Sequence, residues 1–176
     1  MNASSPPVVL TIAGSDSSGG AGVQGDLKTL AAFDVYGVSA ITAITAQNSL
    51  GVSALFPLEA DAVAAQIEAV AGAYPLKATK IGVVANAAIA EAVTAAIQDL
   101  NLPLVVVDPV LISTSGYRLL DDEGIDVLCR ELLPRALIIT PNLAEAEFLS
   151  GRRITSLEQA RAAAVEIHEH TGTAVV

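Results

Sequence analysis

The 176-residue sequence has few of the residues on which several common architectures depend. It contains one cysteine, no tryptophan, three phenylalanines and three tyrosines. A single cysteine excludes an internal disulfide. Cys129 falls on the apolar face formed by Ile125, Leu128 and Leu132, which favours a buried small hydrophobe over a reactive thiol. We therefore expect one core built mainly from small aliphatic side chains.

Positive charge and long apolar runs are also scarce. Nine Lys and Arg residues oppose nineteen Asp and Glu residues, which gives a formal net charge of −10. This balance is the opposite of what nucleic-acid phosphates attract. The first apolar run stops before Gly14 and Asp16, so it is too short for a signal peptide or a membrane span. We expect a cytoplasmic protein with no nucleic-acid partner and no membrane partner.

Apolar strand patterns alternate with helical patterns along the chain. Such repetition of continuous apolar strands and helices predicts an α/β domain with a mostly parallel sheet covered on both faces. No repeat or linker divides it. The expected strands are residues 8–12, 38–46, 78–84, 104–107 and 137–140, and the expected helices lie near 27–31, 62–71, 89–97, 125–133 and 156–170.

Residues 12–29 join the first strand to the first helix through a turn that contains Gly14, Gly19, Gly20 and Gly22. Glycines let the backbone approach a bound group closely, and free N–H groups at a helix start favour anions. The segment lacks the Gly-Lys-Ser/Thr ending of a Walker A loop, and it does not match the dinucleotide fingerprint. A ligand-binding loop and an ordinary solvated turn both remain open.

Polar segments follow four of the expected strands, after Ile12, near Ala46, after Val107 and after Ile139. In a parallel sheet the carboxyl ends of the strands meet at one edge, where ligands collect. The sequence therefore predicts a ligand site at this edge.

Six blocks of the sequence are similar, in the same order, to hydroxymethylpyrimidine/phosphomethylpyrimidine kinases of the ribokinase-like superfamily. The resemblance implies a three-layer ribokinase-like fold with a mostly parallel central sheet, incomplete at the C-terminus. Residues 1–176 would form the amino-terminal portion of a single kinase domain. The six blocks are residues 12–29, 36–43, 45–52, 80–82, 107–110 with 114–116, and 139–146.

The resemblance also implies an activity. The expected reaction is ATP-dependent phosphorylation of 4-amino-5-hydroxymethyl-2-methylpyrimidine, and then of its monophosphate, in thiamine biosynthesis. ATP is the implied co-substrate and Mg²⁺ the implied cofactor. Ribokinase-like relatives often form homodimers, so a homodimer is also expected.

The pyrimidine pocket implied by the resemblance uses Gly14, Asp26, Gln47, Val83 and Val110. The Gln47 amide offers a donor and an acceptor in one plane, which suits the edge of an aminopyrimidine. Asp26 lies in an early helical turn, where it also favours the helix dipole. Val83 stands where relatives commonly have Met, which leaves the substrate preference open.

The expected nucleotide and metal residues are Asp108, Asn142 and Glu145. Asp108 directly follows an expected strand, so its carboxylate would emerge at the ligand edge and position Mg²⁺ or form a turn. Glu145 lies three residues after Asn142, which is the spacing of a helix capping box. The resemblance implies that Asn142 and Glu145 lie near the nucleotide phosphates, and that Glu145 helps Asp108 to organise the metal.

Complete relatives continue into a Val-Lys-Gly-Gly-His segment and a Gly-Thr-Gly-Cys loop that are not in this sequence. We therefore expect this chain to be incomplete for catalysis, and no catalytic base is identifiable in it. Two alternatives remain. One is a pyridoxine or pyridoxal kinase, whose substrate also carries a hydroxymethyl group on a nitrogen heteroaromatic ring. The other is a noncatalytic pyrimidine-binding protein.

Overall fold

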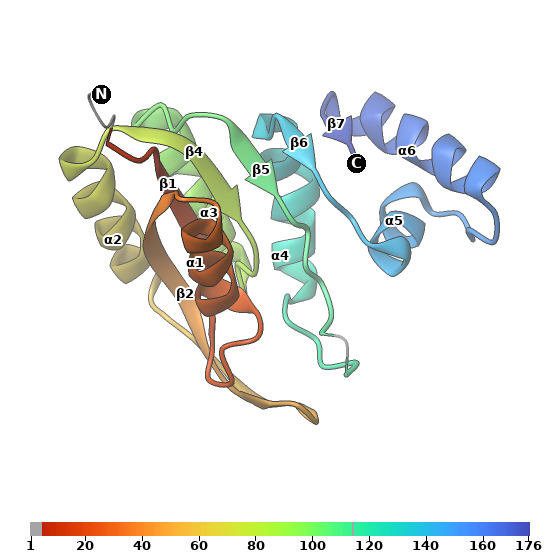
Figure 1. The fold of residues 1–176 in the computed structure, drawn as a ribbon. Helices are drawn as coiled ribbons and strands as arrows, with labels where there is room; N and C mark the ends of the chain where they lie inside the picture. Colours follow the sequence, from red (N-terminus) through yellow and green to blue (C-terminus); the bar gives the residue numbers. More distant parts are fainter. Residues whose placement is uncertain (1–4, 114) are drawn as a thin grey trace.

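The computed structural model describes residues 5–113 and 115–176. Thr114, which belongs to the block 114–116, and the first four residues of the amino end lie outside the described residues. Seven strands form one sheet in the order β3-β2-β1-β4-β5-β6-β7 (Figure 1). Neighbouring strands are parallel except for β2 and β3. The strands are β1 Val8–Asp16, β2 Tyr36–Asn48, β3 Gly51–Pro57, β4 Leu76–Ile81, β5 Val105–Val107, β6 Ile138–Ile139 and β7 Ala174–Val175.

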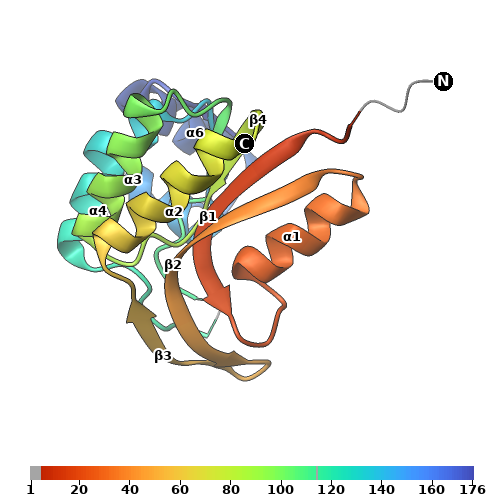
Figure 2. The same cartoon turned by 90° about the vertical axis from the view of Figure 1, so that its left-hand side faces the viewer.

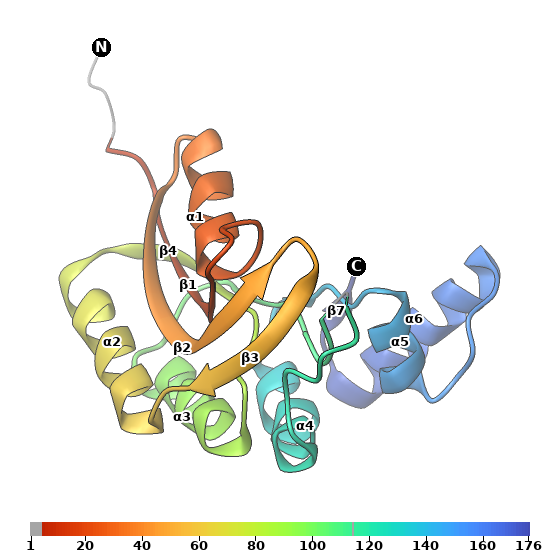
Figure 3. The ribbon, with the colours of Figure 1, turned by 90° about the horizontal axis from the view of Figure 1, so that it is seen from below.

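The helices cover the two faces of the sheet unequally. Helix α1 lies on one face, whereas α2, α3 and α4 lie on the other (Figures 2 and 3). Helices α5 and α6 lie together beside β6 and β7 (Figure 1). The helices are α1 Gly22–Ala32, α2 Ala60–Ala73, α3 Ala87–Asp99, α4 Asp122–Val127 with its π-helical continuation η1 Leu128–Leu132 and the 3-10 turn η2 Leu133–Arg135, α5 Leu143–Ser150 and α6 Leu157–Thr171.

Each of the five predicted strands is present, and the α/β class with a mostly parallel sheet is confirmed. The strand β3 was not predicted. The Asn48 side chain accepts a hydrogen bond from the Leu50 N–H (2.8 Å), and this turn sends the chain back antiparallel to β2. The predicted helix 125–133 is also divided, because α4 passes into a π-helical turn at Leu128.

The core lies mainly between the sheet and the layer of α2, α3 and α4, and small aliphatic side chains fill it as expected. Cys129 lies in η1 and is half-buried, and burial raises the pKa of its thiol. This environment keeps the thiol protonated, in agreement with a packing role. None of the helices within the described ranges is both long enough and apolar enough to cross a membrane.

Two buried threonines of the sheet differ in how their hydroxyls are satisfied. Thr42 and Thr79 are both fully buried. The Thr42 hydroxyl donates to the Val83 carbonyl (2.6 Å), which fixes the loop after β4. The Thr79 hydroxyl has no hydrogen-bond partner within the described part of the chain. A buried hydroxyl without a partner costs free energy, because it loses its bonds to water on folding.

Replacing Thr79 by Val should therefore leave the free energy of unfolding unchanged or raise it by up to about 1 kcal/mol. Thr42→Val is the matched control, because it removes a satisfied hydroxyl and leaves the Val83 carbonyl unpaired. We expect that control to cost about 1–2 kcal/mol. Urea unfolding at pH 7 measures both values. Equal losses in the two variants would show that the Thr79 hydroxyl is satisfied in solution.

Candidate functional site

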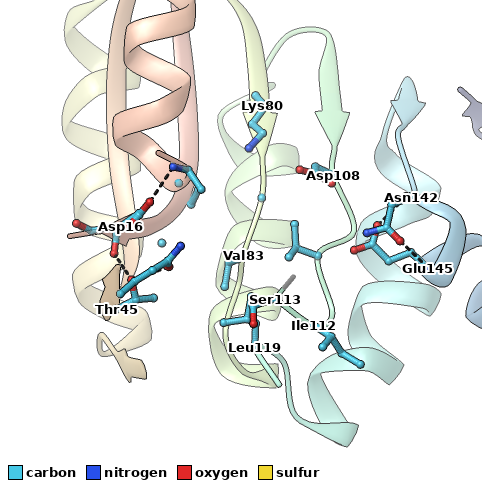
Figure 4. Close-up of a pocket in the computed structure, with 18 residues that line it drawn as sticks. Asp16, Thr45, Lys80, Val83, Asp108, Ile112, Ser113, Leu119, Asn142 and Glu145 are labelled. Atoms are coloured by element: carbon cyan, nitrogen blue, oxygen red, sulfur yellow. Dashed lines mark hydrogen bonds between the residues drawn. The ribbon is translucent and has the colours of Figure 1, made fainter. Parts of the chain in front are cut away.

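A cavity of about 250 Å³ lies at the carboxyl edge of the sheet, where the sequence predicts a ligand site. Residues in the carboxyl-terminal parts of β1, β2 and β4, or just after β4, β5 and β6, line it (Figure 4). The convergence of polar segments on one edge is therefore confirmed. Seven of the eight expected site residues are among the lining: Gly14, Gln47, Val83, Asp108, Val110, Asn142 and Glu145. The eighth, Asp26, is not.

The glycine-rich turn is organised around the carboxylate of Asp16, which is almost fully buried. Its oxygens accept hydrogen bonds from the backbone N–H groups of Ser18 (2.8 Å), Gly20 (2.9 Å) and Ala21 (2.8 Å), and from the Ser18 hydroxyl (2.8 Å). Gly22 follows at a φ of 55°, and a Cβ there would collide with the Gly14 carbonyl oxygen. The amides before α1 thus already hold an anion that belongs to the chain itself.

The Asp16 carboxylate is held in its ionised form by these hydrogen bonds. Burial disfavours the charge of Asp16, but the hydrogen bonds from Ser18, Ala21 and Gly20 outweigh it and hold the pKa below its ordinary value of 3.8. Ionised Asp16 therefore accepts from three amides of the turn, those of Ser18, Gly20 and Ala21. Ala21 and Gly22 border the cavity, so a ligand role for the start of α1 stays a prediction.

Gln47 is held at the end of β2 by two neighbours. The Ser17 hydroxyl donates to the Gln47 carbonyl (2.7 Å) and accepts from the Gln47 N–H (2.9 Å). The Thr45 hydroxyl lies 3.1 Å from the side-chain oxygen of Gln47. These contacts fix the backbone and one end of the amide. Gln47 therefore lines the cavity with its backbone and one end of its amide held in place.

The apolar wall of the cavity includes Val83 and Val110, from the loops after β4 and β5. The Val83 carbonyl is fixed by Thr42, as described above. Gly14 is buried opposite Val83, and a Cβ on Gly14 would lie 3.7 Å from the Val83 Cβ. Gly14 and Val83 therefore lie side by side and give this part of the cavity wall an aliphatic surface, against which a flat ring could pack.

Two carboxylates, those of Asp108 and Glu145, line the opposite side of the cavity (Figure 4). Burial raises the pKa of Asp108, and Lys80 opposes that shift. Burial also raises the pKa of Glu145 against hydrogen bonds from Asn142, and the charge of Asp108 adds to the rise. The cavity therefore disfavours two negative charges side by side, which a bound cation would relieve.

The capping box predicted at the start of α5 is present. The Glu145 carboxylate accepts from the Asn142 N–H (2.9 Å), and the Asn142 side chain accepts from the Glu145 N–H (3.0 Å). These bonds aim the Glu145 carboxylate at the cavity edge. A capping role does not prevent a ligand role, because a carboxylate has several acceptor positions.

Asp26 lies behind the cavity wall. Its carboxylate accepts from the Thr11 hydroxyl (2.6 Å) and pairs with the Lys80 ammonium (3.0 Å), and Lys80 rather than Asp26 lines the cavity. Sequence reasoning gave no role to Lys80 or Asp16. The available signal for Lys80 was a cation within the otherwise uncharged run 78–81 of an apolar strand. The signal for Asp16 was its place just before the glycines.

The donor chemistry of the cavity fits a divalent cation. Asp108 and Glu145 supply hard oxygen ligands, and Mg²⁺ commonly uses only one or two carboxylates together with water and phosphate oxygens. No group of three or more acidic, histidine or cysteine side chains that would hold a metal is found within residues 5–113 and 115–176. Any Mg²⁺ here would therefore need ligands from water or from a bound phosphate.

Asp16→Asn should lower the free energy of unfolding by about 1–3 kcal/mol at pH 7, because a neutral amide cannot accept all the hydrogen bonds of the carboxylate. The folded-state pKa of Asp16 is lowered, so its contribution is fully present above pH 3.8 and is lost as the pH falls through the folded-state value. The difference in the free energy of unfolding between the wild type and the variant should therefore become smaller as the pH is lowered. Urea unfolding from pH 7 to pH 3 measures it.

Asp34→Asn is the matched control for this prediction. Asp34 is exposed at a φ of 56°, a conformation that Asn also adopts readily, so the substitution should change stability by less than about 0.5 kcal/mol. If Asp16→Asn behaves like this control, the carboxylate does not organise the turn.

Comparison with known proteins places these features in a family. A family model described as phosphomethylpyrimidine kinase matches residues 16–176. The hydroxymethylpyrimidine/phosphomethylpyrimidine kinase of Bacillus subtilis (strain 168) is 48% identical over 158 residues, which cover 90% of this chain and 58% of that protein. The crystal structure of phosphomethylpyrimidine kinase from Clostridium difficile 630 has a TM-score of 0.88 at 45% identity, covering 97% of this chain and 74% of that one.

The structural likeness extends to a second kind of kinase. The pyridoxal kinase from Staphylococcus aureus in complex with AMP-PCP and pyridoxal has a TM-score of 0.84 at 35% identity, covering 98% of this chain and 62% of that one. These matches confirm the ribokinase-like fold. The chain spans about six tenths of the length of the curated relatives that it matches. This chain belongs to the phosphomethylpyrimidine kinase family.

Proposed function

We propose that this chain binds 4-amino-5-hydroxymethyl-2-methylpyrimidine in the cavity at the carboxyl edge of the sheet, as part of an ATP-dependent kinase. In the proposed reaction the hydroxymethyl oxygen attacks the γ-phosphorus of ATP, the bond to the β-γ bridging oxygen breaks, and ADP leaves. A second transfer to the phosphate of the monophosphate yields the diphosphate for thiamine biosynthesis. No residue of this chain is proposed as the base that takes the hydroxyl proton.

The main support for this proposal is that one cavity has two chemically different walls. Gly14, Val83 and Val110 give one part of the wall an aliphatic surface, and the amide of Gln47 lies on the same wall. A flat heteroaromatic ring can pack against such a wall, and the amide can form hydrogen bonds with the polar edge of the ring. Asp26 supports this side from behind, through its pair with Lys80.

Across the cavity, Asp108, Asn142 and Glu145 form the proposed nucleotide side. We propose that Asn142 and Glu145 lie against the phosphates of ATP, and that Asp108 and Glu145 hold Mg²⁺ through their carboxylates or through water. When bound, the metal would neutralise phosphate charge during transfer. The capping box contributes by holding the Glu145 carboxylate in place before any ligand arrives.

A pyridoxal kinase is the second candidate, supported by the likeness to the Staphylococcus aureus structure. Val83 bears on the choice, because a β-branched side chain gives this wall a different shape from the Met that is common in the resembling family. Competition between the hydroxymethylpyrimidine and pyridoxal for one binding site separates the two functions. The pyrimidine should displace pyridoxal at the lower concentration.

We also propose that two copies associate through the β2-β3 hairpin, in the cytoplasm where ATP is available. Ile44 and Phe56 pair across the hairpin, and both are exposed, as is Leu50 at its tip. Exposed apolar side chains gathered in this way are typical of an interface. Sedimentation equilibrium distinguishes a dimer from a monomer.

Gln47→Leu should weaken binding of the hydroxymethylpyrimidine by about tenfold or more, because the polar edge of the ring would lose its partner in the cavity. Isothermal titration calorimetry measures the dissociation constant, and AMP-PCP affinity should stay within about twofold, since Gln47 is in β2, which β1, β4 and β5 separate from β6.

Gln98→Leu makes the same chemical change on the exposed surface of α3 and serves as the control. It should bind the pyrimidine as the wild type does. Equal pyrimidine affinity in the wild type and in Gln47→Leu would contradict the proposed pocket. Absence of pyrimidine binding by the wild-type chain would contradict the proposed function.

A further inference from the structure

Lys80 is the single cationic side chain on the wall of the cavity in the described part of the chain. The same wall carries three acidic side chains, those of Asp16, Asp108 and Glu145. The charge of Asp16 is stabilised by hydrogen bonds from the amides of its own turn. The other two carboxylates lie on the side of the cavity that we assign to the nucleotide. Lys80 is therefore the one protein group here that offers a full positive charge to an anionic ligand.

The Lys80 ammonium is anchored from behind by a short chain of polar contacts. It pairs with a carboxylate oxygen of Asp26 at 3.0 Å, and the same oxygen accepts from the buried Thr11 hydroxyl at 2.6 Å. Asp26 belongs to α1 and Lys80 to β4, so the pair spans from a helix to the sheet. This anchor holds the position of the ammonium while the cavity is empty.

Glycine at position 82 leaves the space into which the ammonium extends. A Cβ on Gly82 would lie 2.9 Å from the Lys80 Nζ. The side chain therefore runs along β4 toward its carboxyl end, which is the edge where the cavity lies. Figure 4 shows the ammonium and the Asp108 carboxylate turned toward each other across this space. The chain thus combines a lysine with a nearby glycine so that a charge reaches the cavity.

The ammonium retains donors for a ligand. An ammonium group has three N–H donors, and Lys80 makes one hydrogen bond, to Asp26, with the described residues. Its side chain is 30% exposed although the residue lies in a central strand. Two donors directed from a fixed cation are suited to the oxygens of a phosphate group, because charge-assisted hydrogen bonds are about twice as strong as neutral ones.

We propose that Lys80 binds the phosphate group of the monophosphate substrate and thereby lets one cavity accept both the neutral alcohol and its dianionic ester. This inference rests on the proposed function and deepens it. The neutral alcohol needs no charged partner, whereas its ester brings about two negative charges into a cavity with two carboxylates. Without Lys80, the protein groups on this wall would repel the second substrate and accept the first.

The position of Lys80 in the sheet assigns it to the substrate rather than to ATP. Strand β4 is the neighbour of β1, and Gly14 in β1 and Val83 just after β4 lie side by side on the wall proposed for the ring. Asn142 and Glu145 follow β6, two strands away from β4. A phosphate on the hydroxymethyl group of a ring against this wall is therefore nearer to Lys80 than a nucleotide at α5 would be.

Calorimetric titration of the neutral pyrimidine and of its monophosphate, into wild type and into Lys80→Met, tests this assignment. The variant should bind the monophosphate about tenfold more weakly or worse, and the neutral pyrimidine within about threefold of the wild type. Lys77→Met is the control, because Lys77 is an exposed lysine on the same strand and should not affect either ligand.

The double variant Asp26→Asn with Lys80→Met removes both partners of the ion pair, so that no unpaired buried carboxylate remains. The double variant should still bind the monophosphate more weakly than the wild type does. Recovery of monophosphate affinity in this double variant would overturn the proposal, because Lys80 would then serve only to neutralise Asp26. Equal weakening of both ligands by Lys80→Met, or weakening of AMP-PCP alone, would also overturn it.

A measurement on the wild type keeps the test independent of the folding of the variants. The ε-methylene signal of Lys80 in a ¹H–¹³C spectrum should shift on addition of the monophosphate, and it should shift much less with the neutral pyrimidine. An unchanged signal at saturating monophosphate would contradict the contact. If the wild type bound neither ligand, the proposed function itself would fail, which is a different result from the loss of discrimination.

Discussion

The internal anion at the start of α1 is the constraint on which the ligand edge depends. The Asp16 carboxylate accepts hydrogen bonds from the amides of Ser18, Gly20 and Ala21, and these bonds fix the geometry of the glycine-rich turn. Because those three amides are occupied, the turn has a fixed shape where it borders the cavity. The proposed ligand contacts lie at the ends of neighbouring strands, where Gln47 and Val83 are held by side-chain hydrogen bonds to their backbones.

Charge is distributed across the cavity in a way that suits phosphoryl chemistry. One side has two carboxylates with raised pKa values, Asp108 and Glu145, which a cation would stabilise. The other side has an anchored ammonium, that of Lys80, next to an uncharged wall. A reaction that brings a metal-bound triphosphate to a neutral ring needs this separation of signs. The strongly negative net charge of the chain does not reveal this separation of positive and negative groups within the cavity.

Local patterns in the sequence predicted much of the fold, whereas contacts between distant residues determined what was missed. The strands and most helices followed from apolar periodicity, and the spacing of Asn142 and Glu145 predicted a capping box that the structure contains. The strand β3 was missed because its register depends on pairing with β2. The pair of Lys80 and Asp26 joins residues 54 positions apart, so no local pattern could reveal it.

In the proposed function the ligand contacts groups at the strand ends, while the amides of Ser18, Gly20 and Ala21 stay bonded to the Asp16 carboxylate. An amide ¹H–¹⁵N titration of this chain with 4-amino-5-hydroxymethyl-2-methylpyrimidine tests it most directly. We expect the largest shifts at Gly14, Gln47 and Val83, with the Ser18 and Gly20 amides little changed. Shifts concentrated at Ser18 and Gly20 would mean that the ligand displaces the Asp16 carboxylate, and would contradict the proposed contacts.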